Sequence, residues 1–287
     1  MGRPIQARRR ARCALVGALV FLASPVPAGA WSAEAHVLIN RAACTTLPEP
    51  LRGFFMRHQA LIGEHAVDPG PESSERQGEA ERARHRFRLD ALDRFPFREI
   101  PRTYDAAVAK YGREKLEGAG VLPWRIAGLY GELVAAMRAS DWKRVPLLAA
   151  HLGHTVADGH QPLRTTVNHD GQHTGNAGIH TRFEDELVRR FQAEYQDLAA
   201  FTHPAKPAGD PVAFTFDFLI DSYVWVDNLL RADALAREGL HEYGDAYYRA
   251  LHVFAGRLAK LSMAQAATDL GSLWYSAWIE AGRPRLP

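Results

Sequence analysis

Residues 151–184, HLGHTVADGHQPLRTTVNHDGQHTGNAGIHTRFE, contain two histidine–carboxylate pairs with the same spacing. The first pair, His154 and Asp158, falls in a stretch whose apolar residues repeat as they do in a helix. The second pair, His180 and Glu184, begins another helical pattern. Residues four positions apart lie one above the other on a helix face, so each pair can direct a nitrogen and an oxygen at one cation. Because a loop rich in Gly and Asn joins the pairs, the stretch predicts a metal site built on helices.

Helical patterns also account for most of the chain outside this stretch. Residues 122–138 give the clearest one, because apolar residues recur there at every third or fourth position. We expect further helices at residues 33–46, over residues 50–65, from about residue 145 to Gly159, and two or three long ones within residues 211–283. Strand signals are scarce, and neither a repeat nor a linker divides the chain after residue 30. The sequence therefore predicts one all-α domain over residues 31–287.

The helices of the C-terminal region should supply much of the core. Their apolar positions follow helical spacing, which predicts one buried face on each helix. The core positions predicted there are Leu219, Val226, Leu230, Leu251, Phe254, Leu258, Leu261, Leu270, Trp274 and Trp278. Two earlier segments are less regular. Residues 68–80 predict a polar loop, and residues 82–95 alternate apolar and charged residues in a way that fits either a helix or an extended chain.

The first 30 residues differ from the rest of the chain. A basic segment, MGRPIQARRRARC, precedes a short apolar segment, ALVGALVFLAS, and the stretch ends in the small residues of PVPAGA. This order is typical of a secretory signal peptide, and the apolar segment is too short to span a membrane. Cleavage after Ala30 would make Trp31 the first residue. We therefore expect a secreted or periplasmic protein without an integral membrane segment in the mature chain.

Removal of the signal peptide changes the charge and the cysteine count. Residues 1–30 hold five of the 35 Lys and Arg residues and none of the 33 acidic residues, which leaves 30 basic residues and a net charge of −3. The basic full-length chain is therefore no argument for nucleic-acid affinity. Cys44 would be the one remaining cysteine, so no internal disulfide is expected. A metal cluster could cross-link the helices instead.

A resemblance to a known family connects these features. The predicted junction at Trp31, followed by His36, resembles the start of the zinc-dependent phospholipases C and the related single-strand-specific nucleases. The likeness continues through the two histidine–carboxylate pairs, with a Gln-Pro-Leu turn and a Gly/Asn-rich loop between them. It covers essentially the whole chain after residue 30. The resemblance implies an all-α enzyme with a cluster of zinc ions.

The resemblance also assigns ligands to three zinc ions. The first ion would be bound by the α-amine and carbonyl of Trp31, by His36 and by Asp158. The ligands of the second ion would be Asp68, His85, His154 and Asp158. The third ion would be bound by His180 and Glu184. Asp158 would bridge two ions, and the several carboxylates would offset the repulsion between the dications.

One position departs from the family pattern. The family has a histidine after Gln-Pro-Leu as a further ligand of the third zinc ion, whereas this chain has Arg164. Arginine stays protonated in proteins and cannot bind a metal. The missing ligand could come from His151, His160, His169 or His173; otherwise the site holds two zinc ions, or a third one loosely. His65 and Asp90 are alternatives to Asp68 and His85 at the second ion.

These features predict a zinc-dependent phosphodiester hydrolase. Zinc lowers the pKa of a bound water to about 7 and so supplies hydroxide at neutral pH. By resemblance, Asp68 would orient or deprotonate the nucleophile, and Arg164 is a candidate phosphate clamp. No feature indicates an obligate protein partner.

The sequence leaves three functions open. The spacing between Trp31 and His36 favours a nuclease acting on single-stranded nucleic acid. Glu184, in place of Asp, and the run Val67-Asp68-Pro69 are closer to the phospholipase C branch, which acts on phospholipid head groups. The third possibility is a metal-binding protein that has lost catalysis through Arg164.

Overall fold

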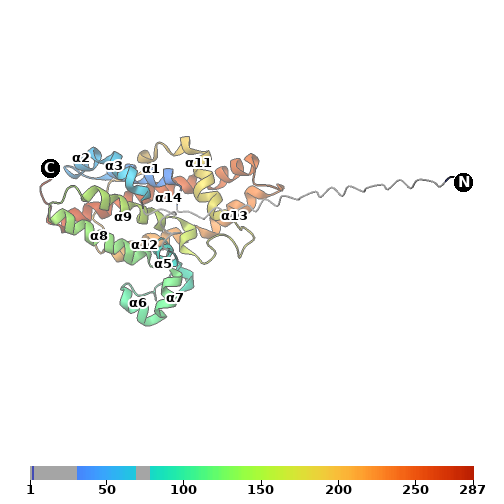
Figure 1. Ribbon diagram of the computed structural model, residues 1–287, viewed down its shortest axis with the longest axis horizontal. Helices are drawn as coiled ribbons and strands as arrows, with labels where there is room; N and C mark the ends of the chain where they lie inside the picture. The colour runs from blue at the N-terminus through green and yellow to red at the C-terminus, as the bar shows by residue number, and fades with distance from the viewer. Residues whose placement is uncertain (1, 3–30, 69–77) are drawn as a thin grey trace.

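The computed structural model describes Gly2, residues 31–68 and residues 78–287 (Figure 1). The predicted signal peptide, apart from Gly2, and most of the predicted polar loop therefore lie outside the described residues. Within the described part of the chain the structure is helical and contains no strand. This confirms the predicted all-α fold.

A central bundle of long helices carries most of the core (Figure 1). Its members are α1 (Ala33–Thr46), α8 (Leu122–Arg138), α9 (Val145–Gly159), α12 (Pro211–Tyr223) and α14 (Asp245–Glu280). Helix α9 packs against the other four. Of its 15 residues, 13 are buried, which is typical of a helix that is apolar around most of its circumference. The histidine–carboxylate pair on α9 is therefore held at the centre of the protein.

Shorter helices complete the fold around this bundle. The α-helices among them are α2 (Leu51–Arg57), α3 (Gln59–Glu64), α5 (Glu79–Ala83), α6 (Tyr104–Tyr111), α7 (Arg113–Ala119), α10 (Ile179–Thr181), α11 (Val188–Arg190) and α13 (Val226–Arg237). The 3-10 helices are η1 (His65–Val67), η2 (Leu89–Ala91), η3 (Pro162–Thr165), η5 (Gln192–Tyr195) and η6 (Leu198–Phe201), and η4 (Arg182–Leu187) is a π-helix. Helices α6 and α7 lie at one edge of the molecule (Figure 1).

Most predicted helices have the expected bounds. Helices α1 and α8 span the predicted residues, and α9 ends at Gly159 as expected. Residues 50–65 form two short helices and the start of η1 instead of one continuous helix. Residues 82–95, which the sequence left undecided, contain the end of α5, a turn and η2.

The core prediction was wrong at two positions of α14. Leu251, Leu270 and Trp274 are fully buried, whereas Phe254 is 51% exposed and Leu261 is 44% exposed. Both exposed residues lie in the first half of this 36-residue helix, on a face that no other described element covers. From Met263 to Ala277 all residues of α14 except Gln265 and Tyr275 are buried, because that half runs through the bundle.

In the described part of the chain, no helix combines the length and the apolar character that crossing a membrane requires. Cys44 is a free, buried thiol on α1.

Candidate metal centre

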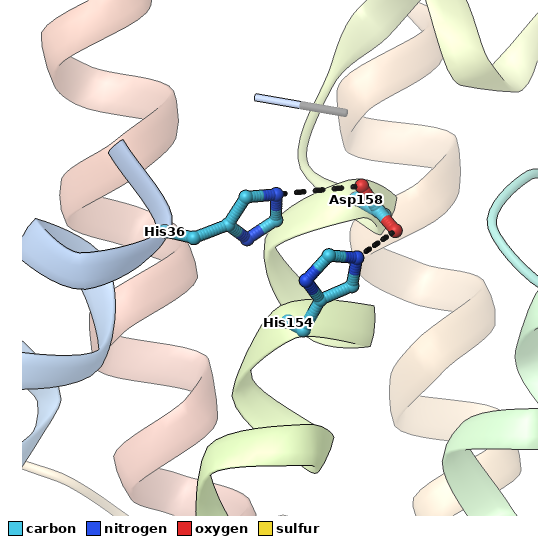
Figure 2. A group of neighbouring side chains, drawn as sticks. All are labelled: His36, His154 and Asp158. Carbon is cyan, nitrogen blue, oxygen red and sulfur yellow. Dashed lines mark ion pairs between the residues drawn. The ribbon is translucent and has the colours of Figure 1, made fainter. Parts of the chain in front are cut away.

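Three buried side chains converge where α1 passes α9 (Figure 2). His36 comes from α1, and His154 and Asp158 come from α9. One nitrogen from each histidine and one oxygen of Asp158 all lie within 4.8 Å of one another. The two imidazole rings are stacked, with their centroids 4.1 Å apart and their planes 2° apart. This group could hold a metal ion.

A close approach of the two helices creates this geometry. Gly153 lies next to His154 on α9, and a Cβ at that position would be 2.0 Å from Oδ1 of Asn40 on α1. Only a residue without a side chain allows the helices to come so near. Asn40 in turn donates a hydrogen bond from Nδ2 to the carbonyl of His36, one turn away. The contact at Gly153 thus sets the distance between the two stacked histidines.

The unsatisfied polar atoms of this group fit a cation. Both ring nitrogens of His36, Nε2 of His154 and Oδ1 of Asp158 are buried without a hydrogen-bond partner among the described residues. Each such atom costs about 1–3 kcal/mol when it stays unpaired. Nδ1 of His154 is 2.8 Å from the carbonyl of Ala66, so Nδ1 carries the proton and Nε2 offers its lone pair. A cation between the side chains would satisfy one ring nitrogen of His36, Nε2 of His154 and an oxygen of Asp158 together.

Burial also gives these side chains the protonation states of metal ligands. Burial, together with the neighbouring His154, holds the pKa of His36 well below its usual value. Burial lowers the pKa of His154 to about 4. Burial opposes ionisation of Asp158, but Arg164 and His154 outweigh it and lower the pKa of that carboxyl. At neutral pH the group therefore has two neutral imidazoles and one carboxylate, as metal binding requires.

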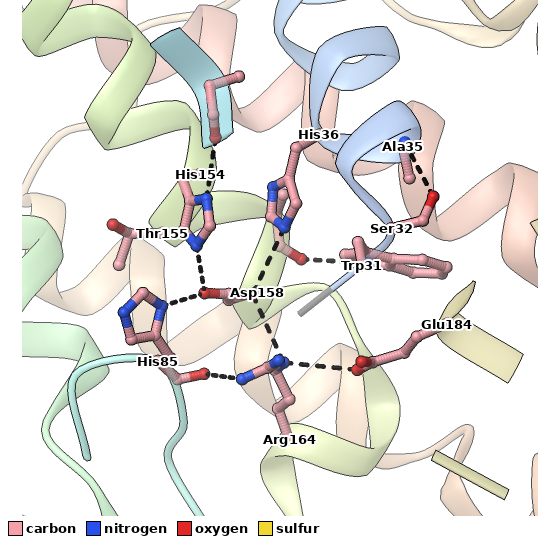
Figure 3. A network of polar contacts seen from close by, with 12 residues as sticks. Trp31, Ser32, Ala35, His36, His85, His154, Thr155, Asp158, Arg164 and Glu184 are labelled. Atoms are coloured by element: carbon pink, nitrogen blue, oxygen red, sulfur yellow. Dashed lines mark hydrogen bonds and ion pairs between the residues drawn. The ribbon is translucent and has the colours of Figure 1, made fainter. Parts of the chain in front are cut away.

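His85 joins the group from the segment after α5 (Figure 3). Its Nδ1 lies 2.7 Å from Oδ2 of Asp158, and its Nε2 lies 3.5 Å from Oε1 of Glu81. Burial opposes protonation of His85, but its hydrogen bond to Asp158 and the nearby carboxylate of Glu81 raise its pKa. His85 was predicted from the sequence and Glu81 was not. The spacing indicates the pair, because Glu81 and His85 are four residues apart, as are the residues of the other two pairs.

Asp68 lies apart from His85 and Asp158. Its side chain is 44% exposed and pairs with two other histidines, His65 at 2.6 Å and His151 at 3.3 Å. His151 is one turn before His154 on α9, so this second group borders the first. Of the two alternatives at the second ion, His65 belongs to the Asp68 group. Asp90 accepts hydrogen bonds from Thr166 Oγ1 and from the amide of Val167, which hold it away from the centre.

His180 and Glu184 form an ion pair on the side of Arg164 away from Asp158. His180 Nε2 lies 3.0 Å from Oε2 of Glu184, as the spacing predicted, and its Nδ1 lies 3.0 Å from the carbonyl of His169. Burial opposes protonation of His180, but Glu184 raises its pKa. Glu184 is buried within the π-helix η4. Single π-helical turns inside helices occur frequently at functional sites.

Arg164 lies between Asp158 and Glu184, the carboxylates of the two pairs (Figure 3). Its Nε is 3.4 Å from Oδ1 of Asp158 and 3.4 Å from Oε1 of Glu184. One terminal nitrogen donates a hydrogen bond of 3.0 Å to the carbonyl of His85. Burial opposes the charge, but Asp158 and Glu184 outweigh it and raise the pKa of the guanidinium. Arg164 is therefore a buried, permanently charged link between both carboxylates.

Trp31 is anchored beside the same residues. Its indole Nε1 donates to the carbonyl of Ala157 at 3.0 Å, and the next residue, Ser32, donates its amide to the carbonyl of Glu184 at 3.2 Å. The Ser32 hydroxyl accepts a hydrogen bond from the Ala35 amide and so caps the start of α1. The main chain of residues 31–32 is thereby held between α9 and η4. The predicted cleavage itself falls outside the described residues.

The remaining histidines named from the sequence have other partners. Both ring nitrogens of His160 are engaged, Nδ1 with the carbonyl of Val156 at 2.8 Å and Nε2 with Asp269 at 2.9 Å. The carbonyl of His169 lies 3.0 Å from His180 Nδ1 and its ring packs edge-on against that of His180, and His173 lies in the loop beside Gln172. Neither His160, His169 nor His173 supplies a nitrogen to Glu184 in the described structure. His151 is paired with Asp68.

Comparison with known proteins adds no relative. No protein-family description matches the chain, and no curated protein matches it either. The family resemblance therefore rests on the sequence motifs alone.

Proposed function

We propose that this chain is a zinc-dependent phosphodiester hydrolase. The observation that supports the proposal is the buried group of His36, His154 and Asp158, whose inward atoms lack partners among the described residues. Imidazole nitrogens and carboxylate oxygens are the usual nitrogen and oxygen ligands of zinc. The group also lies next to further residues that the family resemblance names as ligands. An ordinary core histidine, held by hydrogen bonds, would not need such neighbours.

The residues present divide into two proposed ligand sets that share Asp158. His36 and the α-amine and carbonyl of Trp31 would hold one ion with it, and His85 and His154 would hold another. Zinc, when bound, would supply a hydroxide nucleophile at neutral pH and would offset charge on the phosphoryl oxygens. Glu81 would keep the ring of His85 in place, in the way that carboxylates beside liganding histidines usually do.

Asp68 is the proposed group that orients the attacking water. Its exposed carboxylate borders the centre through His151, and its pKa is lowered because the hydrogen bonds from His65 and His151 outweigh the effect of burial. At neutral pH it is therefore ionised and able to accept a proton. A carboxylate that is exposed to solvent next to the buried ligands, as that of Asp68 is, suits a role in moving protons rather than in holding metal.

The proposed substrate is single-stranded nucleic acid, because the spacing of Trp31 and His36 is closest to the nuclease branch. Phospholipid head groups are the second candidate, because the chain has Glu184 where the nuclease pattern has an aspartate. Both substrates present a phosphodiester, so the same centre would serve either one. Assays on both kinds of substrate distinguish a nuclease from a phospholipase C, and they also detect a protein that binds metal without catalysis.

The test measures zinc content and hydrolysis on the same samples. Full-length chain is secreted from a host that processes signal peptides, and the product is assayed on single-stranded DNA, RNA and phosphatidylcholine vesicles. His154→Ala should lose zinc and hydrolysis together. His241→Ala is the matched control, because His241 is exposed in a turn away from the centre. Zinc-loaded protein that cleaves none of the three substrates would contradict the proposed function, as would full activity in His154→Ala.

A further inference from the structure

Arg164 occupies the place between Asp158 and Glu184 that a bridging cation would take (Figure 3). Its Nε is equally distant, at 3.4 Å, from one oxygen of each carboxylate. The side chains of Asp158 and Glu184 are 0% and 1% exposed, and that of Arg164 is 10% exposed. Two carboxylates buried this deeply need a positive charge nearby, because burying an uncompensated charge is strongly unfavourable.

Several contacts fix the guanidinium in this place. Arg164 donates a hydrogen bond from its side chain to the carbonyl of His85, while its own carbonyl accepts one from the amide of Phe87 at 3.1 Å. The side-chain carbonyl of Gln161 accepts from the amide of Arg164 at 3.2 Å and caps the short helix η3. The backbone of Arg164 is thus tied to the neighbouring segment, and its side chain cannot turn out to solvent without breaking the hydrogen bond to the carbonyl of His85.

His180 Nε2 lies at ion-pair distance, 3.0 Å, from the second carboxylate oxygen of Glu184. Arg164 and His180 therefore flank Glu184 from two sides. A metal ion at this carboxylate would lie against a fixed guanidinium, which offers only donors and no lone pair. One positive charge is therefore already present between the two carboxylates.

We propose that Arg164 is a built-in cation that replaces a metal ion at Glu184 and His180. The chain then binds zinc only on the side of Asp158 that faces His36, His85 and His154. His180 and Glu184 act as a positioning pair that holds Arg164 and stays free of metal. This inference rests on the proposed zinc centre, but it concerns the number and place of the ions and not the reaction.

The experiment counts zinc per chain by native mass spectrometry at saturating zinc. Arg164→His should bind one zinc more than the wild type, because it removes the fixed charge and adds an imidazole beside Glu184. His180→Ala should leave the zinc count of the wild type unchanged, and should remove the extra ion when combined with Arg164→His. Arg144→His is the matched control, because it also places a new histidine beside a glutamate, the exposed Glu132, but away from Glu184 and His180.

The proposed role of Arg164 is overturned if His180→Ala binds less zinc than the wild type, or if folded Arg164→His binds no additional zinc. If Arg164→His does not fold, the His180→Ala count decides alone, since that variant keeps the arginine. A wild type without zinc would count against the proposed function only. The Arg164 inference would then stand if Arg164→His bound one zinc, and would fall if it bound none.

Discussion

His85 Nδ1 lies 2.7 Å from Asp158 Oδ2, although the two residues are 73 positions apart in the sequence. The contact ties the segment after α5 to the last turn of α9. The other ring nitrogen of His85 faces Glu81, which lies one helical turn earlier. The imidazole is therefore held between a carboxylate of the centre and a carboxylate outside it. Such a chain of contacts fixes the orientation of a liganding histidine.

Glu81→Gln should weaken zinc binding without unfolding the protein. The amide keeps the shape of Glu81 but loses the charge that holds His85, and loss of such an outer partner typically lowers metal affinity about 10–100-fold. Zinc affinity is measured by competition with a chelator. Glu79→Gln is the control on the same helix, because Glu79 pairs with Arg82 and Arg86 at the surface. Equal zinc affinity in both variants would remove Glu81 from the site.

Asp158→Asn should lose more zinc than any other single carboxylate change. Asp158 lies against His36, His85 and His154 at once, so two ions would share it. Because metal binding contributes folding free energy, the zinc-dependent part of the melting temperature should disappear as well. Elemental analysis and thermal melts with and without zinc check both effects.

The control for this variant is Asp269→Asn. Asp269 is also a mostly buried aspartate paired with a histidine, His160, but it lies outside the centre. It should lower the melting temperature without changing the zinc count. Full zinc occupancy in Asp158→Asn would show that Asp158 is not a bridging ligand.

An extension in front of Trp31 should lower zinc content and turnover. The contacts from Trp31 to Ala157 and from Ser32 to Glu184 hold this part of the main chain beside the centre. A free α-amine there can bind metal, whereas the amide of an extended chain is a poor donor. Protein beginning at Trp31 is compared with protein carrying one added Gly, and a C-terminal Gly serves as control. The same zinc stoichiometry and turnover in all three would exclude the α-amine as a ligand.

Asp68→Asn should separate catalysis from metal binding. Its carboxylate faces His65 and His151 and not the buried ligands, so the zinc count should stay at the wild-type value. Loss of a proton acceptor typically lowers turnover by about 10²–10⁴-fold. Glu64→Gln, on the exposed surface of the preceding helix, is the control. A reduced zinc count would instead make Asp68 a ligand, and unchanged turnover would remove it from the reaction.

The sequence was most informative where the signal is local. Helices α1, α8 and α9 follow from apolar periodicity, and the contact between His180 and Glu184 follows from four-residue spacing within one helical segment. The convergence of His36 and His154 depends on how closely α1 approaches α9, and so on Gly153 and Asn40. Spacing along the chain carries no information on that distance.

The less predictable features depend on what covers each side chain. Arg164 could be excluded as a ligand from its chemistry, but its place between two carboxylates follows from packing of η3 against the segment at His85. Phe254 and Leu261 have the spacing of core residues and are nevertheless exposed, because no described helix packs on that face of α14. Asp68 turns to His65 because that residue is one turn away on η1.

The central claim is that His36, His154 and Asp158 bind zinc. The most direct test is an anomalous difference map from crystals of the secreted wild-type protein, with data collected on both sides of the zinc absorption edge. We expect a peak about 2.0–2.2 Å from a nitrogen of each histidine and from an oxygen of Asp158. A map with no peak among these three side chains, from protein saturated with zinc, would contradict the account.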